Sequence, residues 1–261
     1  MKLDEIAIGR LAAHLDTCIR EVKDTVKITD TYPEMDWDDA YAVQDALRER
    51  QIARGARVIG YKIGLTSLAK MKQMGVNSPV FGCLLDAHAL PDGGSADTAA
   101  LIHPKVEPEI AFVLERELKG PDCHIGAVLA ATAFVLPGIE IIDSRYRDFK
   151  FDLKSVIADN TSAARFVIGG QPLAIAGADL RTIGIVLERN GESVAFGAGA
   201  AVLGNPAVAV AMLANHLAAR GESIPAGAVI LSGGITEAVA VRPGDNVTLR
   251  IHGMGSISVR F

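Results

Sequence analysis

KVEPEIAFV, residues 105–113, combines an apolar strand pattern with two acidic residues. Most of it suits a buried strand, yet Glu107 and Glu109 stand on either side of Pro108. Successive side chains of a strand point to opposite faces, so the two carboxylates share one face. Pro108 lacks an N–H, which predicts an edge strand or a bulge. Two like charges this close resist burial, and a divalent cation between them would remove the difficulty.

A third acid has a similar setting. Glu140 lies in VLPGIEIID (135–143), again among apolar and β-branched residues. Three carboxylates without an obvious histidine or thiolate partner form an all-oxygen set, which favours Mg²⁺ or Mn²⁺ over zinc. The alternative stays open, because a spacing of two is also what a solvent-facing stripe of an antiparallel strand produces.

Composition sets the broad class of protein. The chain has 261 residues, of which 49% are hydrophobic and 22% charged, typical of a soluble globular protein with one large domain. A net charge of -5 makes nucleic acid an unlikely partner. Cys18, Cys83 and Cys123 are widely spaced, so we expect no disulfide framework, no thiolate metal site and a cytoplasmic setting. We also expect neither a signal peptide nor a membrane span.

The arrangement of helical and strand patterns predicts an α+β fold. Helices are expected at 4–23, between Asp36 and Gly55, and at about 206–220. From about residue 80 the chain is mainly strands separated by turns, and the two types do not alternate regularly. We therefore predict an N-terminal helical part, residues 1–75, packed on a β-rich catalytic body, residues 76–261.

Three further stretches could contribute catalytic or ligand-binding residues. Lys62 lies inside the apolar strand VIGYKIGL (58–65), where burial would lower its pKa and suit it to proton transfer; a lysine at a strand edge is the alternative. The polar stretch 141–162 is interpreted as a lid or substrate loop, or as an exposed connection whose charges pair with each other. LSGGITEA (231–238) could present backbone N–H groups and the Ser232 hydroxyl to an anion, or form a plain turn.

Two common chemistries are excluded. The glycine-rich run FGAGAAVLG (196–204) has Val202 where a dinucleotide fingerprint requires glycine, so we expect no nucleotide site there. The six histidines show neither HxH nor HExxH spacing.

Six runs together resemble the fumarylacetoacetate hydrolase superfamily, in particular its hydratase and decarboxylase branch. They are GYKIGLTS, PVFG, HPKVEPEIAFV, LPGIEIIDSRY, ADNTS and the late SGG turn. The resemblance covers essentially the whole chain. In the hydratases an acid often stands where this chain has Val80, and runs such as DSRYRDFKFDL look more like the decarboxylases.

The resemblance implies a fold, a metal site and an activity. It implies a β-sandwich or roll with N-terminal and peripheral helices, and magnesium or manganese held by Glu107, Glu109 and Glu140, with no organic cofactor. It implies decarboxylation of a 2-oxo dicarboxylate, 2-oxo-3-hexenedioate, in aromatic catabolism. It also implies a homo-oligomer that could associate with the sister hydratase.

The same resemblance implies an active-site role for Lys62. Lys62 and Asp159 are the expected catalytic residues. Arg145, Lys150 and Ser232 are the expected substrate ligands; for the distal carboxylate the candidates are Arg145, Arg147 and Lys150, among which we do not choose. Three other activities stay open: hydration of 2-hydroxypentadienoate, C–C hydrolysis of an acylpyruvate, and a non-catalytic role in an oligomer.

Overall fold

Two β-sheets form the centre of the molecule. The computed structural model describes residues 1–261. One sheet contains β1 (Val58–Gly64), β2 (Val80–Leu85), β3 (Ala89–Leu90), β4 (Lys105–Leu114), β5 (Thr132–Ile142), β6 (Ala163–Ile168), β9 (Val229–Leu231) and β10 (Val239–Ala240). Its order is β2-β1-β9-β4-β5-β6-β3, with β10 also paired to β4. The other sheet has the order β12-β11-β7-β8, formed by β7 (Gly184–Arg189), β8 (Glu192–Ala198), β11 (Asn246–Ile251) and β12 (Gly255–Arg260).

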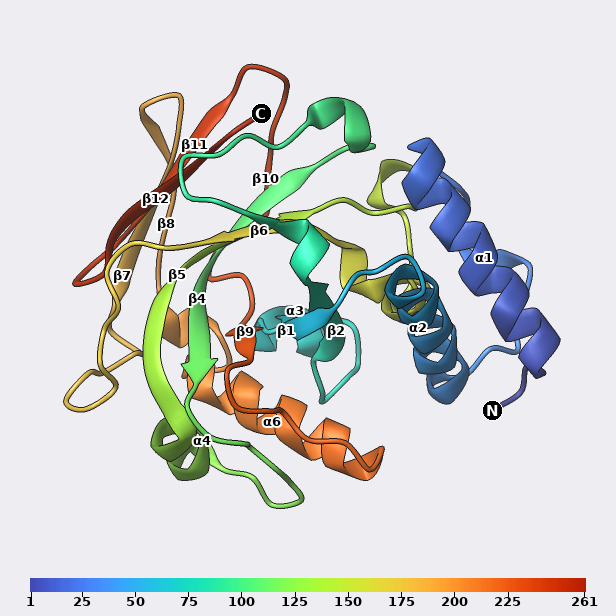
Figure 1. The fold of residues 1–261 in the computed structure, drawn as a ribbon, viewed down its shortest axis with the longest axis horizontal. Coiled ribbons are helices and arrows are strands. Elements are labelled where there is room, and N and C mark those ends of the chain that lie inside the picture. Colours follow the sequence, from blue (N-terminus) through green and yellow to red (C-terminus); the bar gives the residue numbers. More distant parts are fainter.

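Most helices lie to the right of the sheets or below them in the view of Figure 1. The helices are α1 (Glu5–Glu21), α2 (Trp37–Ile52), α3 (Leu68–Gln73), α4 (Ile125–Ala131), α5 (Leu153–Ala158) and α6 (Pro206–Ala219). Short 3₁₀ turns, including η5 (Asn160–Ser162), connect them. The fold is therefore α+β, as predicted. None of the helices combines the length and apolar character that crossing a bilayer requires.

The residues predicted to begin helices cap them in the structure. The Asp36 side chain accepts a hydrogen bond from Asp39 N at 2.9 Å, and the Asp39 side chain accepts one from Asp36 N at 2.9 Å, so a capping box begins α2. Asn205 caps α6, with Pro206 at its first position. These local bonds satisfy backbone donors that a helix start leaves without partners.

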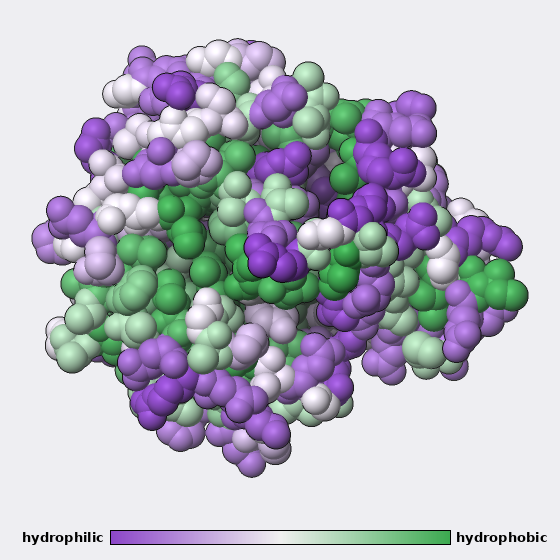
Figure 2. All heavy atoms as spheres, in the orientation of Figure 1, coloured by the Kyte–Doolittle hydropathy of each residue, from purple (hydrophilic) through white to green (hydrophobic).

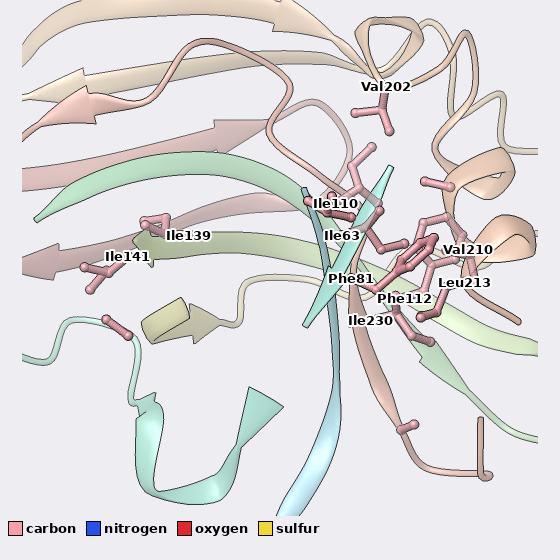
Figure 3. Packing of buried hydrophobic residues seen from close by; sticks show 14 of the residues in the cluster. Ile63, Phe81, Ile110, Phe112, Ile139, Ile141, Val202, Val210, Leu213 and Ile230 are labelled. Carbon is pink, nitrogen blue, oxygen red and sulfur yellow. The ribbon is translucent and has the colours of Figure 1, made fainter. Parts of the chain in front are cut away.

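β4 has two chemically different faces. Ile110 and Phe112 point to one side, where Phe112 lies beside Val210 and Leu213 of α6 (Figure 3). Glu107 and Glu109 occupy the alternate positions and therefore point to the other side. A hydrophobic core on one face thus fixes the register of the strand and the direction of both carboxylates.

The prediction of an edge strand or bulge at Pro108 is wrong. β4 is internal, because it pairs with β5 along one side and with β9 and β10 along the other. On the side of β9 and β10, the loop that connects these two strands lies next to Pro108. Ile235 N of this loop donates a hydrogen bond to Pro108 O at 2.9 Å. The missing N–H of Pro108 faces that loop, where no ladder bond is required.

The expected boundary at residue 75 stays a prediction. β1 lies before it, yet β1 pairs with β2 and with β9, so both sides of the boundary contribute to one sheet. Figure 1 shows α1 and α2 together beside this sheet, and polar side chains cover much of that end in Figure 2. Apolar side chains group over β4 and β5 on the same face of Figure 2.

Two helices were not predicted. Residues 141–162 contain α5, which Asp152 caps by accepting a hydrogen bond from Ser155 N at 2.9 Å, so only part of this stretch is a loop. α4 has the sequence IGAVLAA, which contains no polar side chain to mark a helical period. Both helices are short, and their packing rather than a sequence period defines them.

Candidate active site

The three predicted carboxylates meet on one face of the large sheet. β4 and β5 pair so that Glu107 lies opposite Glu140, and Glu109 opposite Gly138. One carboxylate oxygen from each of the three lies within 4.8 Å of the others. Glu109 and Glu140 are fully buried. Like charges directly opposite one another destabilise a strand pair, so this arrangement requires a compensating positive charge.

Lys62 supplies part of that charge. Its Nζ lies 3.1 Å from Glu140 Oε2 and donates to Thr161 O at 3.1 Å. Gly233 N donates to Glu109 Oε2 at 2.6 Å. Glu109 Oε1 and Glu140 Oε1 are buried without a hydrogen-bond partner. A divalent cation would satisfy both orphaned oxygens, and oxygen ligands are what Mg²⁺ and Mn²⁺ prefer.

Burial changes the protonation of this cluster. It raises the pKa of Glu107 to about 7, that of Glu109 well above its usual range, and that of Glu140 above its usual value, while the positive charge of Lys62 opposes each rise. For Lys62 burial alone would lower the pKa, but the nearby carboxylates raise it. The prediction of a lowered lysine pKa is therefore wrong, and Lys62 is a protonated cation.

Proton competition predicts how metal binding depends on pH. In the metal-free folded protein Glu107 holds its proton up to about pH 7, against 4.5 for the ordinary group. A group with a raised folded pKa makes the metal-free protein less stable as pH rises between these two values. A cation must displace this proton, so stabilisation by Mg²⁺ should grow from pH 5 to pH 8. Melting curves with and without Mg²⁺ measure this; a shift that does not vary with pH would contradict it.

A cavity of about 610 Å³ opens beside the carboxylates. Its polar lining includes Lys62 and Glu107, together with the hydroxyl residues Thr66, Ser67, Thr161, Ser162 and Thr236. Apolar side chains form much of the remaining wall, namely Leu65, Met74, Val80, Ile142, Phe149, Phe151, Leu153, Val156, Phe196 and Ile235. A pocket of this size, with both polar and apolar lining residues, suits a small organic molecule that carries polar groups.

The turn η5 brings strained backbone to the cavity. Asn160, Thr161 and Ser162 have φ values of 48°, 50° and 62°, a left-handed conformation that costs roughly 1–2 kcal/mol for each residue that is not glycine. Asn160 holds the turn to the sheet, because its side chain accepts from Cys83 N at 2.8 Å and donates to Cys83 O at 3.0 Å. In this left-handed turn Thr161 O accepts a hydrogen bond from Lys62 Nζ. Thr161 Oγ1 and Ser162 Oγ are buried and have no hydrogen-bond partner.

Gly82 makes this close approach possible, and its replacement tests the turn. A Cβ at Gly82, opposite Lys62 in the strand pair, would lie 2.6 Å from Thr161 Oγ1 and 2.9 Å from Asn160 O. We expect Gly82→Ala to displace η5 and to destabilise the protein by about 1–3 kcal/mol. Gly9→Ala is the control, since an added Cβ in this helix meets nothing within 4 Å. Calorimetry that finds both variants as stable as the parent protein would contradict the prediction.

The remaining predicted site residues lie elsewhere. Arg145 and Asp159 form a buried ion pair, and neither lines the cavity. Lys150 is 81% exposed and pairs with Asp148 at 3.3 Å. Ser232 is fully buried, and its Oγ has no partner. Arg145 pairs with Asp159, and Lys150 pairs with Asp148. These pairs agree with the second interpretation of residues 141–162, in which the charges of this stretch pair with each other.

Several lining residues escaped sequence analysis. Thr161 and Ser162 belong to the ADNTS run, and Thr66 and Ser67 to GLTS, but no local pattern indicates that their hydroxyls face one cavity. Lys70 and Glu237 also line it.

The fold and the carboxylate cluster define a family. The family model described as fumarylacetoacetate (FAA) hydrolase C-terminal matches residues 87–261, and the chain belongs to this family. The predicted family and branch are confirmed by the relatives. The chain is 59% identical to a 4-oxalocrotonate decarboxylase of Pseudomonas sp. (strain CF600), over 96% of this chain and 95% of that one.

A more distant curated relative has a different activity. The chain is 41% identical to a 2-keto-4-pentenoate hydratase of Paraburkholderia xenovorans (strain LB400), over 96% of this chain and 93% of the hydratase. Among solved structures, a 4-oxalocrotonate decarboxylase from Pseudomonas putida G7, complexed with magnesium and adipate, matches with a TM-score of 0.97 and 53% identity. That match covers 100% of this chain and 99% of the other.

Proposed function

We propose that this protein is a magnesium-dependent carboxy-lyase that converts 2-oxo-3-hexenedioate to 2-hydroxypenta-2,4-dienoate and CO₂ in the meta-cleavage degradation of aromatic compounds. The observation that carries the proposal is the cluster of three buried carboxylates and Lys62 at the end of a small-molecule cavity. It occurs in a chain 59% identical to a 4-oxalocrotonate decarboxylase. Adipate, found with magnesium in the similar solved structure, is a dicarboxylate with as many carbons as this substrate.

Glu107, Glu109 and Glu140 would hold the cation. The fit rests on the two orphaned oxygens, Glu109 Oε1 and Glu140 Oε1, and on a charge excess that Lys62 alone does not neutralise. Gly233 N orients Glu109 through its other oxygen. When bound, Mg²⁺ or Mn²⁺ supplies a Lewis acid that stabilises negative charge at the 2-oxo end of the substrate.

Lys62 would act at the same end. In the reaction the bond to the distal carboxylate breaks, CO₂ leaves, and its electron pair passes through the conjugated double bond to the ketone oxygen. The protonated Nζ of Lys62, held by Glu140 and Thr161 O, can stabilise the charge on this oxygen and give it a proton. The substrate is thus its own electron sink, which explains why no organic cofactor is expected.

The apolar wall would disfavour hydration. Val80 lines the cavity with a side chain that cannot activate water. Phe151, Leu153 and Val156 extend this surface and exclude solvent from the carbon chain of a bound substrate. These residues support decarboxylation over the addition of water that the hydratase relative performs.

Product analysis tests the proposal. Purified protein with Mg²⁺ is supplied in parallel with 2-oxo-3-hexenedioate and with 2-hydroxypenta-2,4-dienoate, and EDTA is the control. We expect CO₂ from the first compound, no turnover of the second, and loss of activity with EDTA. Turnover of the second compound alone would make the protein a hydratase. If the protein turns over neither compound, the result would favour the hydrolase or the non-catalytic role.

Association is a separate part of the proposal. We propose a cytoplasmic homo-oligomer that can also bind the sister hydratase, supported by the similarity of this chain to both enzymes over nearly its full length. Light scattering of the protein alone, and after mixing with a hydratase, measures both kinds of assembly. A monomer that stays separate would overturn this part.

A further inference from the structure

The cavity wall contains four charged residues, and only one of them is a cation without a fixed partner. The four are Lys62, Lys70, Glu107 and Glu237. Lys62 is 2% exposed and committed to Glu140 and Thr161 O. Lys70 is 53% exposed, and its Nζ lies 3.6 Å from Glu237 Oε1, a carboxylate that is itself 88% exposed. Lys70 is therefore free to exchange this partner for an anionic ligand.

We propose that Lys70 binds the distal carboxylate of the dicarboxylate substrate, and that Glu237 competes with the substrate for this lysine. The inference deepens the proposed function and rests on it. It assigns opposite effects to the two residues of one ion pair: Lys70 favours dicarboxylate binding, and Glu237 opposes it.

Chain connectivity places both residues at the cavity. Lys70 lies in α3, which is separated by three residues from β1, the strand of Lys62, and Ser67 caps this helix by accepting a hydrogen bond from Lys70 N at 3.4 Å. Glu237 lies in the loop after β9, the same loop whose Gly233 N binds Glu109. The segments that carry Lys62 and Gly233 thus continue directly into the segments that carry the ion pair.

Other nearby cations do not line this cavity. Lys105 Nζ lies 4.0 Å from the centre of the Phe149 ring, and Arg147 is paired with Asp24 at 2.9 Å. Arg145 is buried against Asp159. A substrate whose 2-oxo end lies beside Lys62 and Glu107 therefore has Lys70 as the available cation for its second carboxylate.

A weak contact at this position suits the reaction. The distal carboxylate loses its negative charge as it becomes CO₂, so a strong grip would stabilise the ground state more than the transition state. A half-exposed lysine shared with Glu237 binds with modest strength. Loss of Lys70 should therefore raise KM and kcat by a similar factor and leave kcat/KM nearly unchanged, because this contact stabilises the bound substrate but not the transition state.

Binding of adipate and hexanoate to the Mg²⁺-loaded protein tests the inference by calorimetry. Both acids have six carbons, but only adipate has a second carboxylate. We expect the parent protein to prefer adipate. Lys70→Met should weaken adipate binding about tenfold, the lower end for a hydrogen bond to a charged group, and leave hexanoate unchanged. Lys70→Arg should retain most of the preference.

Two further variants separate binding from structure. Glu237→Gln should tighten adipate binding about threefold, because the competitor for Lys70 is removed. Lys72→Met carries the same charge change on the same helix but lies outside the cavity wall, so it should not affect the preference. Unchanged adipate affinity in Lys70→Met, or weakening in Glu237→Gln as in Lys70→Met, would overturn the inference.

The inference and the proposed function fail in different ways. CO₂ release by a parent protein that binds both acids equally would retain the function and overturn the role of Lys70. No CO₂ release, together with a Lys70-dependent preference for adipate, would support the carboxylate site and overturn the proposed reaction.

Discussion

Replacement of Glu109 by glutamine should reduce magnesium-dependent turnover by about 100- to 1,000-fold, the range for losing one preorganised electrostatic contact. Glu109 is fully buried, one of its oxygens is fixed by Gly233 N, and the other has no partner. The amide keeps the shape of the side chain but removes the negative charge that a cation requires. Rates of CO₂ release should show the loss of turnover, and calorimetric titration should show the accompanying loss of Mg²⁺ affinity.

Stability separates this effect from misfolding. Burial and the neighbouring carboxylates raise the pKa of Glu109 well above its usual range, so glutamine resembles the protonated form that the metal-free protein favours, and we expect the metal-free variant to be at least as stable as the parent protein. Its melting temperature should no longer respond to Mg²⁺. Glu115→Gln, an exposed change just beyond the same strand, is the control. Normal metal affinity and turnover in Glu109→Gln would contradict the assignment.

Replacement of Lys62 by methionine should lower kcat by about 100- to 1,000-fold, because the cation that stabilises the developing charge is lost. Mg²⁺ affinity should not fall, since a positive charge beside the metal site has been removed. This combination distinguishes Lys62 from the carboxylates, whose loss should reduce metal affinity as well as turnover. Single-turnover kinetics and Mg²⁺ titration measure the two quantities.

The same variant has a stability signature. Lys62→Met leaves Glu140 buried without its ion-pair partner, which should cost about 3 kcal/mol in the metal-free protein. Bound Mg²⁺ should restore much of this loss, because it replaces the missing positive charge. Lys72→Met, on the exposed side of a short helix, should change neither property. Full activity in Lys62→Met would remove this residue from the mechanism.

Local patterns were sufficient for part of the site. The alternation of a strand placed Glu107 and Glu109 on one face, and the capped helices were found from residues such as Asp36 and Asn205. From the residue pattern Glu140 was recognised only as a third acid in a similar strand, and the family resemblance added it to the metal ligands. Its position opposite Glu107 depends on the register between β4 and β5, which hydrophobic packing and distant turns determine.

The features that local patterns did not predict depend on contacts between segments far apart in the sequence. Pro108 tolerates an internal strand because a loop from residues 232–238 faces it, and no local pattern reveals that neighbour. The left-handed turn at Thr161 and Ser162 is one that these residue types rarely adopt, so sequence propensity predicts against it. Arg145 fitted a substrate ligand by charge, but its partner Asp159 could be recognised only in three dimensions.

Anomalous scattering from crystals of the protein with Mn²⁺ and adipate would locate the metal without reference to activity. The predicted result is one anomalous peak ligated by Glu107, Glu109 and Glu140, with adipate in the cavity beside Lys62. A peak elsewhere, or one that leaves Glu109 and Glu140 unligated, would contradict the claim that these three carboxylates hold the cation.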